Sequence, residues 1–343
     1  MYLLVLEESR QSWFRYAAFH LFKWWTMTFS TFEKKVLKEI AASYRQREPK
    51  WSSWVKKPLG STFDFLGKTN SEYFDRLVVG FQSALSKVIL KAIQTGGAFV
   101  KDASIDQAFS REGLHFSDVS HIRTLPFWQR DRISLHFRNN GAHLLVGQGA
   151  LLGAGVTAAE LLPFAQVTIP ALVASDILLA TTSLARNAAC TGTCYGFSMH
   201  NADSLPHLVA ALSPPAFHED SLDRELLLRK AIVEADQFMA EYAGKKITRK
   251  MVQKYAPTFQ KLITKTGKYM GLVMTERKLA IGLPVAGALL NSGLNMMLLR
   301  RSFRNARNYY RRLCLEEKYG IQEVSAALKG YQQRQLETEK DRG

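Results

Sequence analysis

A stretch of 21 residues without a charged side chain, 279–299, is the feature that most constrains how this chain can fold. It reads LAIGLPVAGALLNSGLNMMLL. A helix of about 20 mostly apolar residues is long enough to cross the hydrocarbon core of a bilayer. A helix buried at the centre of a soluble bundle gives the same pattern. The stretch therefore predicts a helix that lies in lipid or in a protein core.

Basic residues lie on both sides of this stretch. Residues 245–278 contain ten Lys and Arg and one acid, Glu276, and residues 300–312 contain six Arg and no acid. The two blocks hold almost all of the net charge of +16 that the 343 residues carry. Each Lys or Arg near an acidic membrane surface contributes roughly 1 kcal/mol of attraction. The side chains that we expect to contact lipid headgroups are Arg277, Lys278, Arg300, Arg301 and Arg304.

A second apolar region, 139–185, contains two charged residues, Glu160 and Asp176. Its composition predicts a helical hairpin over about 141–185, with a bend near Leu162–Pro170 and a second helix that starts near Pro170. Glu160 and Asp176 would be costly in lipid unless they were paired. A hairpin in the protein core and a hairpin that faces lipid are therefore both compatible with the sequence.

Small residues at four-residue spacing recur in both apolar regions. Such residues let helix backbones approach closely, in membranes and in soluble bundles. The residues that we expect at close helix contacts or in an inserted segment are Gly149, Gly153, Pro170, Gly282, Ala286, Gly287 and Ala288.

The N-terminal part of the chain is rich in aromatic residues. Residues 13–32 contain nine of them, interleaved with Arg15, His20 and Lys23. Trp beside cationic residues suits the headgroup layer, because the ring is partly apolar and partly polar. Trp24 and Trp25 are therefore candidate membrane anchors, and packing of the same rings onto the protein body is the alternative. The short apolar run 1–6 does not resemble a secretory leader.

The sequence predicts a mainly α fold, a helical bundle with a Gly/Ala-rich apolar hairpin and a second apolar helix. Periodic apolar residues indicate helices over 70–95, 205–212, 219–243 and 248–275, whereas 98–122 resembles a loop. No run of alternating apolar and polar residues indicates strands. We expect an N-terminal segment 1–58, a helical domain 59–330 and a polar tail 331–343.

Three cysteines are too few for a disulfide framework and indicate a reducing compartment. Cys190 and Cys194 share a helix face, but their spacing from His200 and His207 matches no zinc signature. The groups of a hydrolase are also present near the end of this region, without a nucleophile-elbow pattern around the serine: Ser198, His200, Asp203 and His207. We predict no catalytic residue, no metal site and no cofactor, with a hydrolase around Cys194–His207 as the least favoured reading.

Several motifs together resemble the EcsC protein family of bacteria. The resemblance runs from about residue 32 to residue 319. It rests on Glu33, Leu37, Ile40 and Trp51 or Trp54, on the Gly-rich block 147–155, on Ile169-Pro170-Ala171-Leu172, on Tyr195-Gly196-Phe197, and on 284–288 with Asn291 and Arg300-Arg301. The chain departs from the family at Thr168, where the family often has an Asp. The resemblance implies a helical bacterial protein associated with an ABC-transporter operon, in a family with no established reaction.

These observations predict a membrane-associated accessory protein at the cytoplasmic face of the bacterial inner membrane, linked to transport, export or envelope maintenance. Anionic lipids are the expected partners, with a membrane transporter or another protein as a further candidate. A basic chain also suits nucleic acid, but the basic blocks flank apolar helices rather than a nucleic-acid module. The alternatives are a soluble protein-interaction module in the cytoplasm and a protein that inserts conditionally and perturbs membranes.

Overall fold

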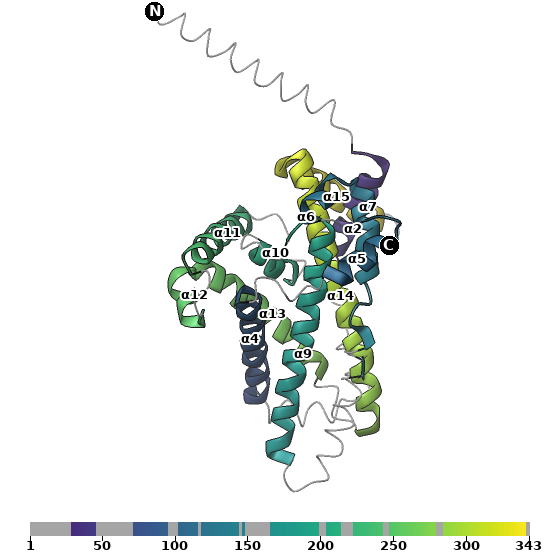
Figure 1. The fold of residues 1–343 in the computed structure, drawn as a ribbon. Helices are drawn as coiled ribbons and strands as arrows, with labels where there is room; N and C mark the ends of the chain where they lie inside the picture. The colour runs from purple at the N-terminus through teal and green to yellow at the C-terminus, as the bar shows by residue number, and fades with distance from the viewer. Residues whose placement is uncertain are drawn as a thin grey trace, which may run out of the picture. The chain divides into compact units, whose positions relative to one another are not determined.

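A computed structural model of the chain describes residues 29–45, 71–94, 102–115, 118–143, 146–147, 165–198, 204–213, 222–242, 247–278 and 284–340. Within these ranges it contains twelve α-helices, one 3₁₀ helix and no strand, which confirms the mainly α prediction (Figure 1). The elements are α2 (Thr31–Arg45), α4 (Ser71–Gln94), α5 (Asp102–Ser110), α6 (Val119–Thr124), α7 (Phe127–Ser134), η1 (Leu135–Phe137), α9 (Ala165–Cys194), α10 (Ser204–Ala211), α11 (Leu222–Tyr242), α12 (Arg249–Tyr255), α13 (Pro257–Lys278), α14 (Pro284–Tyr319) and α15 (Ile321–Lys340).

The chain forms two compact units. The smaller combines residues 1–41 with 315–343, and the larger comprises residues 42–314. The divisions after residues 58 and 330 stay predictions. Residue 330 lies inside α15.

The small unit is built around the start of α2. Ser30 and Glu33 form a capping box, in which the Glu33 N–H donates to Ser30 Oγ (3.2 Å) and the Ser30 N–H donates to Glu33 Oε2 (2.8 Å). The Lys318 ammonium and the Tyr319 hydroxyl, at the end of α14, also donate to the Glu33 carboxylate, each at 2.8 Å. Gly320 then takes a left-handed φ of +92° and separates α14 from α15.

Helix α9 contributes a long buried segment to the large unit. From Ile177 to Cys194 most of its side chains are buried, and the apolar ones belong to the main core. Two of its buried polar side chains donate hydrogen bonds to backbone carbonyls: Asn187 Nδ2 to Phe137 O (2.7 Å) and Thr191 Oγ1 to Asn187 O (2.8 Å). This part of the second apolar region therefore lies in the protein core.

The prediction that a helix starts near Pro170 was wrong by about a turn. Helix α9 begins at Ala165, and Pro170 lies inside it. Pro170 is the sixth residue of α9, beyond the first four N–H groups that have no partner within the helix, so the helix lacks the N–H donor that residue 170 would otherwise supply to the carbonyl four residues earlier. The segment 98–122 was also predicted wrongly as a loop, since it contains α5 and the first four residues of α6. Asp118 starts α6 by accepting from the His121 N–H at 2.8 Å.

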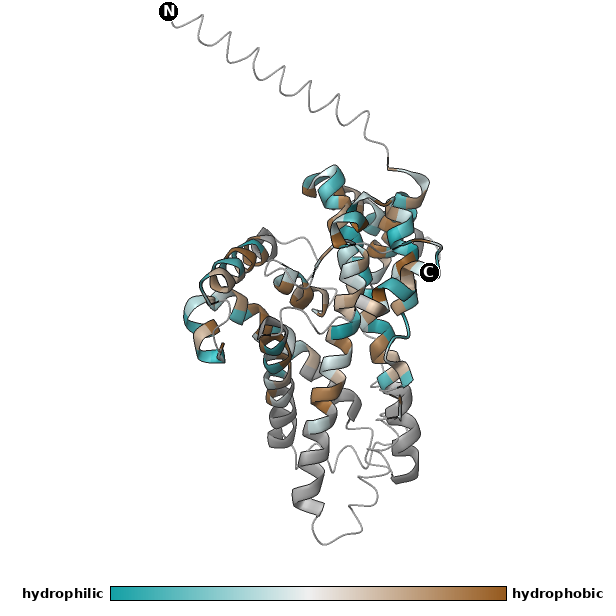
Figure 2. Ribbon diagram, viewed as in Figure 1, coloured by the Kyte–Doolittle hydropathy of each residue, from teal (hydrophilic) through white to brown (hydrophobic). Residues whose placement is uncertain are grey.

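Helices α4 and α13 pack closely along their lengths. A Cβ atom added at Gly267 of α13 would lie 2.8 Å from the Cα atom of Gln82 in α4. The two backbones can approach this closely only because residue 267 has no side chain. The described helices carry both apolar and polar residues (Figure 2), as expected for helices with one buried and one solvated face.

The apolar stretch 279–299 forms the first part of α14, from Pro284 onward. At its C-terminal end Asn295, Leu298 and Leu299 are buried within the protein. Among the residues that the structure describes, no helix has both the length and the apolar character needed to cross a membrane.

Candidate functional site

The six arginines of the block 300–312 lie on two stripes of α14. Residues spaced by four and three positions share a helix face, so Arg300, Arg304, Arg307 and Arg311 form one stripe. Arg300 and Arg304 are exposed, whereas Arg307 is half-buried and Arg311 is buried. Some arginines of the block are therefore exposed to solvent, whereas others lie in the protein interior.

The inner arginines bind a buried carboxylate, Asp131 of α7, whose residue exposure is 4%. Arg307 donates to both oxygens, from Nε to Oδ1 (3.1 Å) and from Nη2 to Oδ2 (2.6 Å). Arg311 does the same from the next turn, with Nη2 at 2.8 Å from Oδ2. The hydroxyl of Tyr195 donates to Oδ1 at 2.6 Å. Both carboxylate oxygens are therefore saturated with donors.

These donors determine the protonation states in the cluster. Burial alone would raise the pKa of Asp131, but the hydrogen bonds and charges of Arg311 and Arg307 outweigh burial and hold it below its usual range. Burial and the neighbouring Asp131 raise the pKa of Tyr195 well above its ordinary value. The ionised carboxylate of Asp131 and the neutral phenol of Tyr195 therefore form a stabilising hydrogen bond rather than an acid–base pair.

The end of α9 places Tyr195 in this cluster. Gly196 adopts a left-handed φ of +93°, and the Phe197 N–H donates back to Gly192 O at 3.1 Å, which closes the helix. Arg123 Nε donates to Gly196 O at 3.0 Å. The Tyr-Gly-Phe motif is thus a helix terminus that directs the tyrosine toward Asp131.

A small cavity of about 40 Å³ lies beside an earlier part of α14, on the N-terminal side of Arg307. It is lined by α9, α13, α14 and the residue that follows α10. Its apolar wall consists of buried side chains from four segments: Leu184, Leu212, Met270 and Leu298. Its polar wall is half-buried and consists of Tyr269, Arg301, Ser302 and Asn305. These eight side chains include one cation and no acid.

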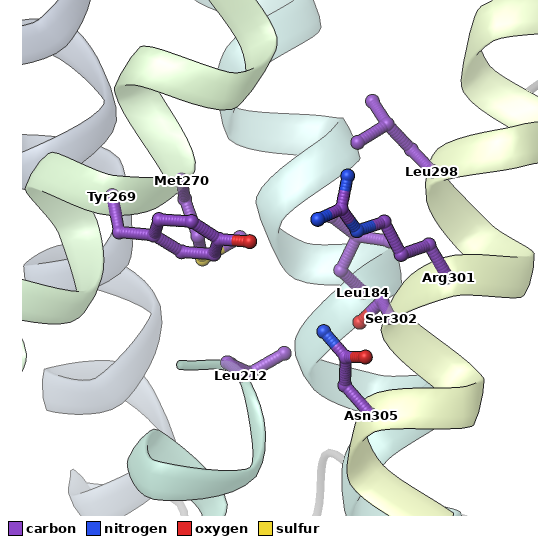
Figure 3. Close-up of a pocket in the computed structure, with 8 residues that line it drawn as sticks. All are labelled: Leu184, Leu212, Tyr269, Met270, Leu298, Arg301, Ser302 and Asn305. Atoms are coloured by element: carbon purple, nitrogen blue, oxygen red, sulfur yellow. The ribbon is translucent and has the colours of Figure 1, made fainter. Parts of the chain in front are cut away.

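Figure 3 shows how the polar groups face the cavity. The guanidinium of Arg301 and the amide of Asn305 extend from α14 toward α13, and the hydroxyl end of Tyr269 points back toward them. Leu184 lies behind them, and Leu212 lies on the side of Asn305. The arrangement combines donors for an anion with a short apolar surface.

The predicted headgroup residues lie in different places. Arg300 is exposed, and its Nε donates to Asn139 Oδ1 at 3.4 Å. Arg301 lines the cavity, and Arg304 is exposed on the next turn. Three other arginines of the block 300–312 are committed to the protein interior, since Arg307 and Arg311 bind Asp131 and Arg312 is buried.

Several predicted residues are described only by their helix or lie outside the described part of the chain. Pro170 is in α9, Arg277 and Lys278 end α13, and Ala286, Gly287 and Ala288 lie in the first turns of α14. Trp24, Trp25, Gly149, Gly153 and Gly282 lie outside the described residues.

The residues considered for thiol, metal and hydrolase chemistry lie near the end of α9. Burial raises the pKa of Cys190 to about 12 and that of Cys194 well above its ordinary value, so both thiols are protonated. His207 shares a 2.7 Å hydrogen bond with the Tyr309 hydroxyl. His200 and Asp203 lie outside the described residues. Over the described ranges, no three His, Cys, Asp or Glu side chains form a group that could hold a metal ion.

Sequence reasoning missed Asp131, because a single acid between Arg130 and Arg132 resembles a solvated charge. The missed signal was the spacing of Arg307 and Arg311, which puts two cations on one helix face. It also missed the cavity, whose walls come from residues more than a hundred positions apart.

Comparisons with models of protein families, with curated proteins and with solved structures found no match to this chain. The resemblance to the EcsC family therefore stays a prediction, and the argument for function rests on the residues themselves.

Proposed function

We propose that the protein is a membrane-associated accessory protein that binds anionic lipids at the cytoplasmic face of the bacterial inner membrane. The observation that carries the proposal is the division of the α14 arginines. Asp131 engages Arg307 and Arg311, whereas Arg300 and Arg304 are exposed on the same stripe. Two outward cations one turn apart suit the phosphates of a lipid surface.

Two further basic helices of the large unit support the same role. Exposed Lys and Arg side chains continue along α12 and α13: Arg249, Lys250, Lys254, Lys261, Lys265 and Lys268. Their combined field attracts an acidic surface over about one Debye length, roughly 8 Å at physiological salt. A role in transport, export or envelope maintenance comes from the family resemblance and is part of the proposal.

Vesicle cosedimentation tests the proposal. The double variant R300Q/R304Q should bind vesicles that contain phosphatidylglycerol about 30-fold more weakly, because two arginines contribute roughly 1 kcal/mol each. The matched control is K34Q/K38Q, which removes the same charge from two exposed positions of α2 in the small unit. The control should bind almost as well as the parent protein.

Two results would count against this proposal. Equal weakening in both variants would mean that only net charge matters and that α14 has no special role. Binding that is unchanged in R300Q/R304Q would exclude these arginines as lipid contacts. Vesicles of phosphatidylcholine alone, and 0.5 M salt, should both abolish binding if the attraction is electrostatic.

A protein-interaction module is the second candidate, favoured by one observation on α11. Leu226 and Val233 lie seven residues apart on one face, and more than half of each residue's surface is exposed. If this face binds a partner protein, L226K/V233K should lose that partner in a pull-down from membrane extracts while vesicle binding is unchanged. Loss of vesicle binding in this variant would instead indicate that this face of α11 contacts lipid.

A further inference from the structure

The cavity between α9, α13 and α14 is distinct from the exposed arginines that the proposed function uses. Its volume is about 40 Å³. A water-sized group needs roughly 10–15 Å³ by this measure, so the cavity holds about three such groups, the size of the two methylenes and the methyl of a four-carbon acid. An acyl chain of a phospholipid is far too long for it.

The polarity of the walls limits the chemistry of an occupant. The four buried residues of the wall are aliphatic or Met, which suit methyl and methylene groups. The half-buried residues supply one guanidinium, one amide and two hydroxyl groups at the side nearer to solvent. An occupant with an anionic end at the polar wall and a short alkyl end at the apolar wall would match both.

Arg301 favours a carboxylate as the anionic end. A guanidinium presents five N–H donors in a planar fork that matches the two oxygens of a carboxylate. With five donors a guanidinium can bind more than one acceptor at a time. The Asn305 amide, which faces the same space in Figure 3, adds donors from the next turn of α14.

We propose that this cavity is a binding site for a short-chain aliphatic carboxylate of about four carbon atoms, such as butanoate. The carboxylate pairs with Arg301 and is oriented by Asn305 and Ser302. The alkyl part lies against Leu184, Leu212, Met270 and Leu298. The site goes beyond lipid binding at Arg300 and Arg304, and it does not depend on it.

A ligand-observed NMR titration of the full chain tests the site with acetate, propanoate, butanoate, hexanoate and decanoate. We expect the affinity to peak near butanoate, with a Kd on the order of 1 mM, as is usual for so few atoms. Butan-1-ol should bind at least about tenfold more weakly, since it lacks the charge-assisted pair. An affinity that rises steadily to decanoate would overturn the proposal and indicate a fatty-acid chain that leaves the cavity.

Two variants locate the ligand. R301Q should weaken butanoate binding about tenfold or more, whereas K268Q removes an exposed cation from α13 and should leave binding unchanged. L298A removes three carbon atoms from the apolar wall and should move the preferred ligand from butanoate toward hexanoate or longer acids. Such a shift cannot result from loss of folding.

The remaining outcomes contradict the proposal. Equal binding of butanoate and butan-1-ol would exclude a carboxylate site, and no saturable binding below 50 mM would exclude the site altogether. An unchanged chain-length preference in L298A would place the alkyl group elsewhere. The vesicle test changes Arg300 and Arg304 and leaves Arg301 intact. The lipid-binding proposal and the carboxylate-binding proposal can therefore fail independently of each other.

Discussion

Two tyrosines that stack on each other, Tyr195 and Tyr310, show how one residue type takes two roles. Their ring centroids are 6.2 Å apart. The Tyr195 hydroxyl donates to the ionised Asp131, whereas the buried Tyr310 hydroxyl has no hydrogen-bond partner among the described residues. The first hydroxyl should stabilise the fold, and the second should not.

We therefore expect opposite results from two equal changes. Tyr195→Phe removes a hydrogen bond to a charged group and should lower the free energy of unfolding by about 1.5–3 kcal/mol. Tyr310→Phe removes an unpaired buried hydroxyl and should be neutral or stabilising, within about 1 kcal/mol. Urea denaturation of both variants measures the difference. A large loss in Tyr310→Phe would show that its hydroxyl has a partner in the folded protein.

At the scale of the element, the contact between α4 and α13 depends on a glycine that sequence reasoning did not single out. The predicted close contacts were at Gly149, Gly153 and the Gly/Ala residues of 282–288. Among described helices, Gly267 provides such a contact, where α13 meets the backbone of α4. Gly267 and Gly271 do have the four-residue spacing of small residues, but they lie in the basic segment 245–278, outside the two apolar regions where that spacing was considered.

Gly267→Ala should destabilise the large unit. The added Cβ would lie 2.8 Å from a backbone atom, which cannot move aside as a side-chain end can. Overpacking of this kind costs about 1–3 kcal/mol. The control is Gly80→Ala in α4, whose Cβ would lie at an ordinary 3.5 Å from Ile177 Cδ1. We expect this control to gain about 0.5–1 kcal/mol from helix propensity, as measured by chemical denaturation. A destabilised Gly80→Ala together with an unaffected Gly267→Ala would contradict the requirement for glycine at position 267.

At the scale of the whole molecule, each unit contains one buried carboxylate with a lowered pKa. Glu33 lies in the small unit and Asp131 in the large one. Burial alone would raise the pKa of Glu33, but the hydrogen bonds from Lys318, Ser30 and Tyr319 lower it from 4.5 to about 2. Both units therefore depend on a carboxylate that stays ionised.

The pH dependence of stability follows from this shift. A carboxylate whose pKa is lower in the folded state stabilises the fold above its unfolded pKa. For Glu33 this stabilisation is complete above about pH 5 and is lost as the pH falls from 4.5 to about 2. In Glu33→Gln, the deficit in unfolding free energy relative to the parent should be constant from pH 5 to 7 and should shrink below pH 4.5. A deficit independent of pH down to pH 2 would mean that the Glu33 charge does not contribute.

Much of the secondary structure could be predicted from the sequence. The predicted helices 70–95, 205–212 and 219–243 correspond to α4, α10 and α11, with ends within three residues. Their apolar periodicity is a local property, and Gly96-Gly97 and Pro214-Pro215 follow two of them. The predicted helix 248–275 is instead two helices, α12 and α13, because Pro257 starts the second.

The candidate sites could be predicted only in part. Arg300, Arg301 and Arg304 were expected at a ligand surface, and the structure separates Arg301, at the cavity, from its exposed neighbours. Asp131 and the cavity depend on which helices meet. No local pattern indicates that α7 brings an acid to the inner arginines of α14.

By itself the sequence determined the helical class, the concentration of positive charge and the positions of the apolar stretches, because these depend on composition and on periodicity along the chain. Only the tertiary structure decided which arginines bind a buried carboxylate and which remain exposed. It also decided that α9 from Ile177 onward lies in a protein core. The physical reason is that the free energy of a charge or an apolar side chain depends on its surroundings, and packing between distant segments creates those surroundings.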